Sequence, residues 1–134
     1  MEKWIAAVSG VIGTIVSYAV NGLGITVTVL ICFMAIDYLT GLMSSIINKN
    51  LSSRVGFEGI IRKIYYLMLL GSVYLLALII PGIGYAGDGT AIALCVLEFI
   101  SITENGVKMG LPTPKIIKNI LAMVKETKGE EESK

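Results

Sequence analysis

Histidine is absent from this 134-residue sequence, and charged residues make up only 16% of it. An ordinary soluble domain carries roughly 25% charged residues. Without histidine, the commonest general base and metal ligand is missing. The net charge of +1 gives no electrostatic reason to expect nucleic-acid binding. Since no nucleophile with its base, phosphate-binding loop or metal-ligand cluster is recognisable either, we expect no enzyme activity, catalytic residue, metal, cofactor or small-molecule substrate.

Cysteine is also scarce, and both copies, Cys32 and Cys95, lie inside apolar runs. This placement indicates buried free thiols rather than a disulfide or a metal site. What the sequence has in excess is apolar side chains, because 54% of its residues are hydrophobic. A soluble protein of this size has too much surface to bury so many of them. The composition therefore predicts a protein embedded in a lipid bilayer.

Four apolar segments are candidates for membrane-spanning helices, which need about 20 mostly apolar residues. They cover residues 4–20, 23–47, 64–80 and 89–105. Small polar residues interrupt the first segment, which either spans the membrane or lies on its surface. Asn21-Gly22 is a turn signal before the second segment. The sequence thus predicts an all-α integral membrane protein with three to four transmembrane helices.

Two further stretches have the pattern of amphipathic helices at the membrane interface. In residues 52–63, Arg54, Glu58 and Arg62 recur at four-residue spacing and form a charged helix face. We expect this helix to lie on the inner surface and to turn before span 64–80. In residues 114–125, an apolar stripe opposite several lysines suits an anionic membrane leaflet.

The domain prediction is accordingly simple. Residues 1–125 form a single membrane domain, and residues 126–134 form a charged, disordered tail.

Lysine and arginine are distributed as the positive-inside rule requires for a cytoplasmic C-terminus. They gather between the second and third spans and after the fourth, whereas the stretch 81–89 carries only Asp88. We therefore expect the stretch 81–89 on the outside. The basic residues at the inner interface are Lys49, Arg54, Arg62, Lys63, Lys108, Lys115, Lys118, Lys125 and Lys128.

Two carboxylates lie within predicted spans, where a central charge costs about 2.5–3.5 kcal/mol on insertion scales. Asp37 either lines a water-filled path or pairs with Arg62 or Lys63. Glu98 either lines a pore or is buried as a hydrogen-bonded carboxyl, with Gly71 of an antiparallel span as its neighbour. Both alternatives remain open for each residue.

The first segment carries small residues at four-residue spacing, a pattern that lets helices approach closely in lipid. This helix-packing face either joins copies of the chain or packs within one protomer. It comprises Ser9, Gly13 and Ser17, with Ala6, Gly10 and Thr14 beside them.

Three motifs give the chain a family resemblance. Ile36-Asp37-Tyr38-Leu39-Thr40-Gly41 closes the second span, and Asn50-Leu51-Ser52-Ser53-Arg54-Val55-Gly56-Phe57 follows it. Glu98, Thr103-Glu104-Asn105-Gly106 and Gly110-Leu111-Pro112-Thr113-Pro114-Lys115 come later. Over residues 30–124, their order and spacing resemble the toxin secretion/phage lysis holin family.

This resemblance implies a homo-oligomer in the bacterial cytoplasmic membrane, with a possible antiholin partner. It implies timed lesions through which a cell-wall hydrolase or a large toxin leaves the cell. A non-pore regulatory subunit, such as an antiholin or scaffold, and a small ion channel are the alternatives. Thr40-Gly41 ends the second span beside Asp37, where polar groups can meet the basic loop. We further expect Asp37, Arg62 or Lys63, and Glu104-Asn105 to form a polar cluster that fixes how the last three spans pack.

Overall fold

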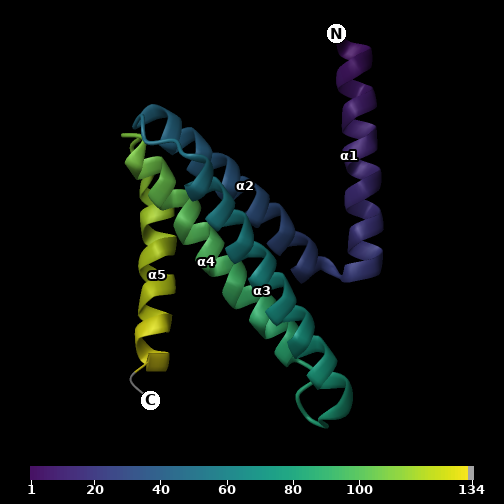
Figure 1. The fold of residues 1–134 in the computed structure, drawn as a ribbon. Helices are drawn as coiled ribbons and strands as arrows, with labels where there is room; N and C mark the ends of the chain where they lie inside the picture. Colours follow the sequence, from purple (N-terminus) through teal and green to yellow (C-terminus); the bar gives the residue numbers. More distant parts are fainter. Residues whose placement is uncertain (133–134) are drawn as a thin grey trace.

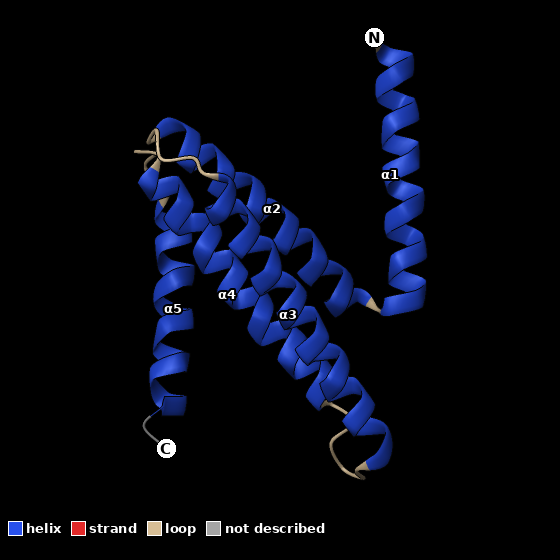
Figure 2. Cartoon of the chain, in the orientation of Figure 1, coloured by secondary structure: helices blue, strands red, loops and turns tan. Residues whose placement is uncertain are grey.

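The computed structural model describes residues 1–132, except for the side chains of residues 16, 19, 20, 127, 128 and 130–132. This part of the chain contains helices and connecting loops but no strand, as Figure 2 shows. The helices are α1 (Glu2–Leu23), α2 (Ile25–Ile47), α3 (Ser53–Ile79), α4 (Ala86–Lys108) and α5 (Lys115–Glu132) (Figure 1). The all-α prediction is therefore confirmed.

Helices α2, α3 and α4 form a bundle in which α4 packs extensively on α2 and less extensively on α3, while α2 and α3 touch little (Figure 1). Helices α2 and α4 run in the same direction, and α3 runs against both. Residues 48–52 and 109–114 consequently share one end of the bundle, called the inner end here. Residues 80–85 form the opposite, outer end. The two basic stretches that were predicted to be cytoplasmic thus meet at one end.

The bundle has a small core and an apolar exterior. Its buried apolar side chains, within the described residues, are Leu30, Met34, Leu70, Ala91 and Leu94. Large apolar side chains such as Leu39, Met68 and Leu78 are exposed instead. Three helices, α2, α3 and α4, are long and apolar enough to cross a membrane. Because lipid is the solvent that such a surface suits, the chain is an integral membrane protein.

A polar contact ties the three helices together at the outer end. The hydroxyls of Thr26 on α2 and Tyr74 on α3 each donate a hydrogen bond to Asp88 Oδ1 on α4, and each donor–acceptor distance is 2.7 Å. Gly87 makes this approach possible, since a Cβ there would lie only 2.3 Å from a ring carbon of Tyr74. The sequence reading placed Asp88 in an outer loop and missed this contact.

Three predicted boundaries are wrong. The chain breaks at Gly24, with φ +84°, whereas Asn21-Gly22 is still helical. Residues 52–63 make no turn before residue 64, because α3 is one continuous helix from its Ser52 N-cap onward. Its length of ~40 Å exceeds the ~30 Å hydrocarbon core. Helix α5 continues to Glu132 through residues that were predicted to be disordered, since lysine and glutamate favour helix. Residues 133 and 134 lie outside the described part.

The first and last helices lie beside the bundle rather than in it. Figure 1 shows α1 leaving α2 at Gly24 and extending away from the other helices. Helix α5 returns along the bundle from the inner end, after a connection that contains Gly110 with φ +77°. Whether α1 spans the membrane and whether α5 lies at the interface stay predictions.

The Gly87–Tyr74 contact can be tested by adding one methyl group. We expect Gly87→Ala to lower the unfolding free energy in detergent by about 1–3 kcal/mol, because Tyr74 must move out of its place between α3 and α4. The matched control is Gly89→Ala, where the new methyl meets nothing within 4 Å. Equal stability of the two variants would contradict this account of the outer end.

Candidate functional site

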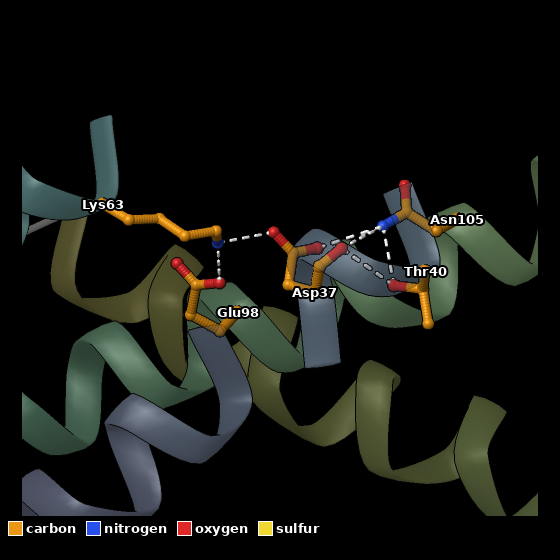
Figure 3. Close-up of polar contacts among 5 residues, drawn as sticks. All are labelled: Asp37, Thr40, Lys63, Glu98 and Asn105. Atoms are coloured by element: carbon orange, nitrogen blue, oxygen red, sulfur yellow. Dashed lines mark hydrogen bonds and ion pairs between the residues drawn. The ribbon is translucent and has the colours of Figure 1, made fainter. Parts of the chain in front are cut away.

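An ion triad joins the three helices of the bundle. Lys63 Nζ on α3 lies 2.7 Å from Asp37 Oδ2 on α2 and 2.5 Å from Glu98 Oε2 on α4 (Figure 3). The side chains of Lys63, Asp37 and Glu98 are 16%, 15% and 7% exposed. Because one ammonium faces two carboxylates, a single contact point holds all three helices.

The triad lies deep in the bundle. Asp37 precedes the end of α2 at Ile47 by ten residues, and Glu98 precedes the end of α4 at Lys108 by the same number. At 1.5 Å per residue, this places both carboxylates ~15 Å from the inner helix ends, about half-way along these helices. Unmatched charges at this depth are costly, so the pairing with Lys63 is what makes α2 and α4 acceptable as membrane helices.

Asn105 of α4 extends the triad toward the inner end. Its side-chain nitrogen donates to Asp37 Oδ1 at 3.1 Å and to Thr40 Oγ1 at 3.0 Å (Figure 3). The Thr40 hydroxyl in turn donates to the main-chain oxygen of Asp37. Gly41 leaves room for this amide, since a Cβ there would lie 3.6 Å from Asn105 Nδ2. Interhelical hydrogen bonds of this kind hold membrane helices together where the hydrophobic effect does not.

Two neighbouring contacts account for the remaining motif residues. The Tyr38 side chain lies against two glycines of α3, Gly56 and Gly59. A Cβ on Gly56 would contact its hydroxyl, and a Cβ on Gly59 would contact its ring. Ser52 caps α3 by accepting a hydrogen bond from the Val55 amide. These contacts set the position of α3 against α2, and thereby the height at which Lys63 meets Asp37.

A polar cavity of about 600 Å³ lies between α2, α3 and α4 and reaches from the inner end of the bundle to the triad. Its walls carry polar residues at helical spacing on α2 and α4. On α2 and its C-cap these are Asp37, Ser44 and Asn48, and on α4 they are Ser101, Asn105 and Lys108. The Asn48 amide also donates to the Lys108 main-chain oxygen at 3.0 Å and ties the two inner helix ends together.

The outer half of the bundle has the opposite character. Between the triad and the Thr26–Tyr74–Asp88 contact lie the five core residues, all of them apolar. Leu30 is completely buried among them, and Thr28 is a buried polar residue on the same side of the triad, with its hydroxyl donating to the Gly24 main-chain oxygen. The bundle is therefore polar and open on its inner side and dry on its outer side.

The structure brings together only some of the residues that the sequence singled out. Asp37, Thr40, Lys63, Glu98 and Asn105 lie in one cluster (Figure 3). Glu104 and Arg62 are exposed and lie outside it.

Glu98 meets Lys63 and not Gly71, because Lys63 is part of the continuous helix α3 and reaches down beside α4. The sequence reading treated Lys63 as interfacial and so missed this pair. The signal that reveals the cavity is the recurrence of polar residues every three or four positions in the inner halves of α2 and α4.

Two other predicted sets lie outside the cluster. Arg54 and Glu58 form an exposed ion pair of 2.9 Å, of a kind that contributes little stability. The small residues of α1 face open space, since a Cβ on Gly10 or Gly13 would meet nothing within 4 Å. Ser9 and Ser17 are likewise exposed.

Comparison with known families accounts for this arrangement of motifs. The model of the bacteriophage holin family matches residues 14–126, which include every member of the triad and its amide extension. The chain belongs to the bacteriophage holin family. The resemblance that the motifs carried is thereby confirmed, and so is the prediction of an integral membrane protein.

Relatives of this holin-family chain occur in Listeria and Clostridium species. An uncharacterized protein of Listeria monocytogenes is 35% identical over 122 residues, which cover 91% of this chain and 87% of the relative. An uncharacterized 14.9 kDa protein of Clostridium perfringens, from the region 3′ of nagH, is 30% identical over 118 residues, with 87% and 89% covered. No solved structure matches the chain.

Removing the ammonium should damage the bundle of this holin-family chain severely. We expect Lys63→Met to cost about 3–5 kcal/mol of unfolding free energy, because two buried carboxylates lose their common partner. Arg62→Met is the matched control, since its side chain is exposed on the same helix; we expect a change within about 0.5 kcal/mol. Unfolding in detergent, followed by circular dichroism, measures both; equal values would refute a central role for Lys63.

Proposed function

We propose that this chain is a holin that self-associates in the bacterial cytoplasmic membrane and forms timed lesions. A cell-wall hydrolase or a large toxin then leaves the cytoplasm through them. The observation that carries the proposal is the buried polar cluster around Lys63 inside a bundle with an apolar exterior. Membership of the holin family supports it.

The packed bundle suits the period in which a holin accumulates without damage to the membrane. Each buried charge has a partner, and the outer half of the bundle contains a dry apolar core. A protomer in this state presents mostly apolar side chains to lipid and offers no continuous aqueous path. It is therefore compatible with an intact membrane.

A water-filled lesion must be lined by polar side chains, and the bundle contains such side chains on α2 and α4. The polar stripes on α2 and α4 face each other in the packed protomer, with Asp37 and Asn105 in direct contact. When α2, α3 and α4 separate, these stripes meet water. Ser44 and Ser101 would lie in the same wetted surface. We infer that opening proceeds by loss of the contacts around Lys63 and hydration of the stripes.

The remaining parts have roles in assembly and orientation. The exposed small-residue face of α1, with Gly10 and Gly13 unobstructed, is the surface we assign to contact between copies of the chain. The inner end, with its basic residues, is placed in the cytoplasm by the positive-inside rule. With α5 on the inner membrane surface, as its amphipathic pattern predicts, the C-terminus is cytoplasmic as well.

Expression in a bacterial host tests the proposed function directly. We expect a delay, followed by the simultaneous collapse of membrane potential and release of a large cytoplasmic reporter protein. Loss of potential with the reporter retained would instead identify a small ion channel. If the protein is present in the membrane and neither change occurs, the chain is a non-pore subunit such as an antiholin or scaffold.

The polar cluster should control when lesions form. In Asp37→Asn the carboxylate that joins Lys63 to Asn105 is lost, so we expect a shifted lysis time and fewer oligomers after cross-linking. Arg54→Gln is the matched control, because Arg54 is exposed at the inner end and pairs with Glu58 rather than with the cluster. Unchanged timing and unchanged oligomers in Asp37→Asn would argue against a part for the cluster in opening.

A further inference from the structure

The ion triad is not electrically balanced by the side chains that form it. Asp37 and Glu98 contribute two negative charges when ionised, whereas Lys63 contributes one positive charge. Three ionised groups therefore leave a net charge of −1 half-way along the bundle. Asn105 and Thr40 supply hydrogen bonds to this site but no charge.

No other charged group of the described structure is placed to supply the missing charge. On α3, Arg62 is exposed and Glu58 pairs with Arg54. On α4, Lys108 lines the cavity but lies ten residues, or ~15 Å, from Glu98. The uncharged titratable groups nearby are Tyr38, whose hydroxyl lies at Gly56, and Cys95, whose sulfur faces the Thr26 carbonyl on α2.

The polar cavity reaches the site from the inner end of the bundle. The polar cavity that opens at the inner end is lined by Asp37 and Lys63 at its deep end, so water and protons from that side reach the triad. Toward the outer end the path meets Leu30 and Leu94, which belong to the dry core. The cavity therefore gives protons of the inner compartment a route to the triad.

We propose that Asp37 and Glu98 together hold one proton in the packed bundle, taken up through the inner cavity, so that the triad is neutral. Two largely buried carboxylates that share one ammonium repel each other when both are charged, and the proton belongs to the pair rather than to either residue. The ligand of the site is the proton. The proposal concerns the bundle itself and does not require that the chain form lesions.

A direction of pH dependence follows. In a separated, hydrated bundle both carboxylates are solvated and release the shared proton, so packing takes up one proton and opening releases it. By linkage, the stability that the proton contributes is present at low inner pH and is lost as the pH rises and the proton leaves. A higher pH on the inner side therefore favours the open bundle.

Infrared spectroscopy of the full chain in lipid vesicles tests the proton directly. At neutral pH we expect the carbonyl band of one protonated side-chain carboxyl, which disappears as the pH is raised. Asp37→Asn and Glu98→Gln each leave one carboxylate opposite Lys63, so both variants should lack the band. Lys63→Met should show twice the intensity. Asp88→Asn is the control and should keep the band, since Asp88 lies at the other end of the bundle.

The presence or absence of the carboxyl band decides the proposal. Absence of the band from the wild-type chain at neutral pH would overturn the proposal, because both carboxylates would then be ionised. A band that survives in both Asp37→Asn and Glu98→Gln would overturn it as well. Because these two substitutions keep the side-chain shape and a hydrogen-bonding group, the test does not depend on whether Lys63→Met folds. Lysis assays play no part in the readout, so this proposal and the proposed function can fail independently.

Discussion

The structure depends on one constraint: charges placed half-way along membrane helices must find their partners within the protein, because lipid cannot solvate them. Lys63 is the partner of both Asp37 and Glu98, and it comes from the helix that runs against the other two. This single requirement fixes the relative heights of α2, α3 and α4. Tyr38, Gly41 and Asn105 then fit around the triad as the close approach of these helices requires.

The same constraint divides the bundle into unlike halves. Toward the inner end, polar residues recur along α2 and α4 and enclose a cavity. Toward the outer end, the buried side chains are mainly those of leucine, methionine and alanine, with Thr28 beside them. A second polar contact, around Asp88, closes the outer end. The dry segment between the two polar sites is what separates the inner side from the outer side within a protomer. An aqueous path therefore requires that helices move apart.

The sequence was sufficient for the properties that depend on local pattern. Apolar runs predicted the helices, and the motif from Asp37 to Gly41 contained the residues that meet Asn105. Contacts between segments that are far apart in the sequence were harder to predict. The pairing of Glu98 with Lys63 was missed because a charged stretch before residue 64 suggested a turn, whereas the glycines facing Tyr38 let α3 continue straight along α2. Gly24 rather than Asn21-Gly22 ends α1, since a positive φ and not a polar turn residue decides the break.

The triad contributes less to the stability of the packed bundle than well-packed apolar residues could. Replacing a buried ion cluster by well-packed apolar residues is often neutral or stabilising, by about 1–4 kcal/mol. In lipid, leucine or methionine at positions 37, 63 and 98 would satisfy the packed bundle without any matching of charges. Compared with leucine or methionine, the charged residues are favoured only in a state where water reaches them. They therefore stabilise the hydrated bundle relative to the packed one, and the free-energy difference between these two states becomes smaller. We infer that this narrow difference, rather than the strength of the packed state, is what the polar interior provides: a bundle that is stable in lipid yet able to open into water.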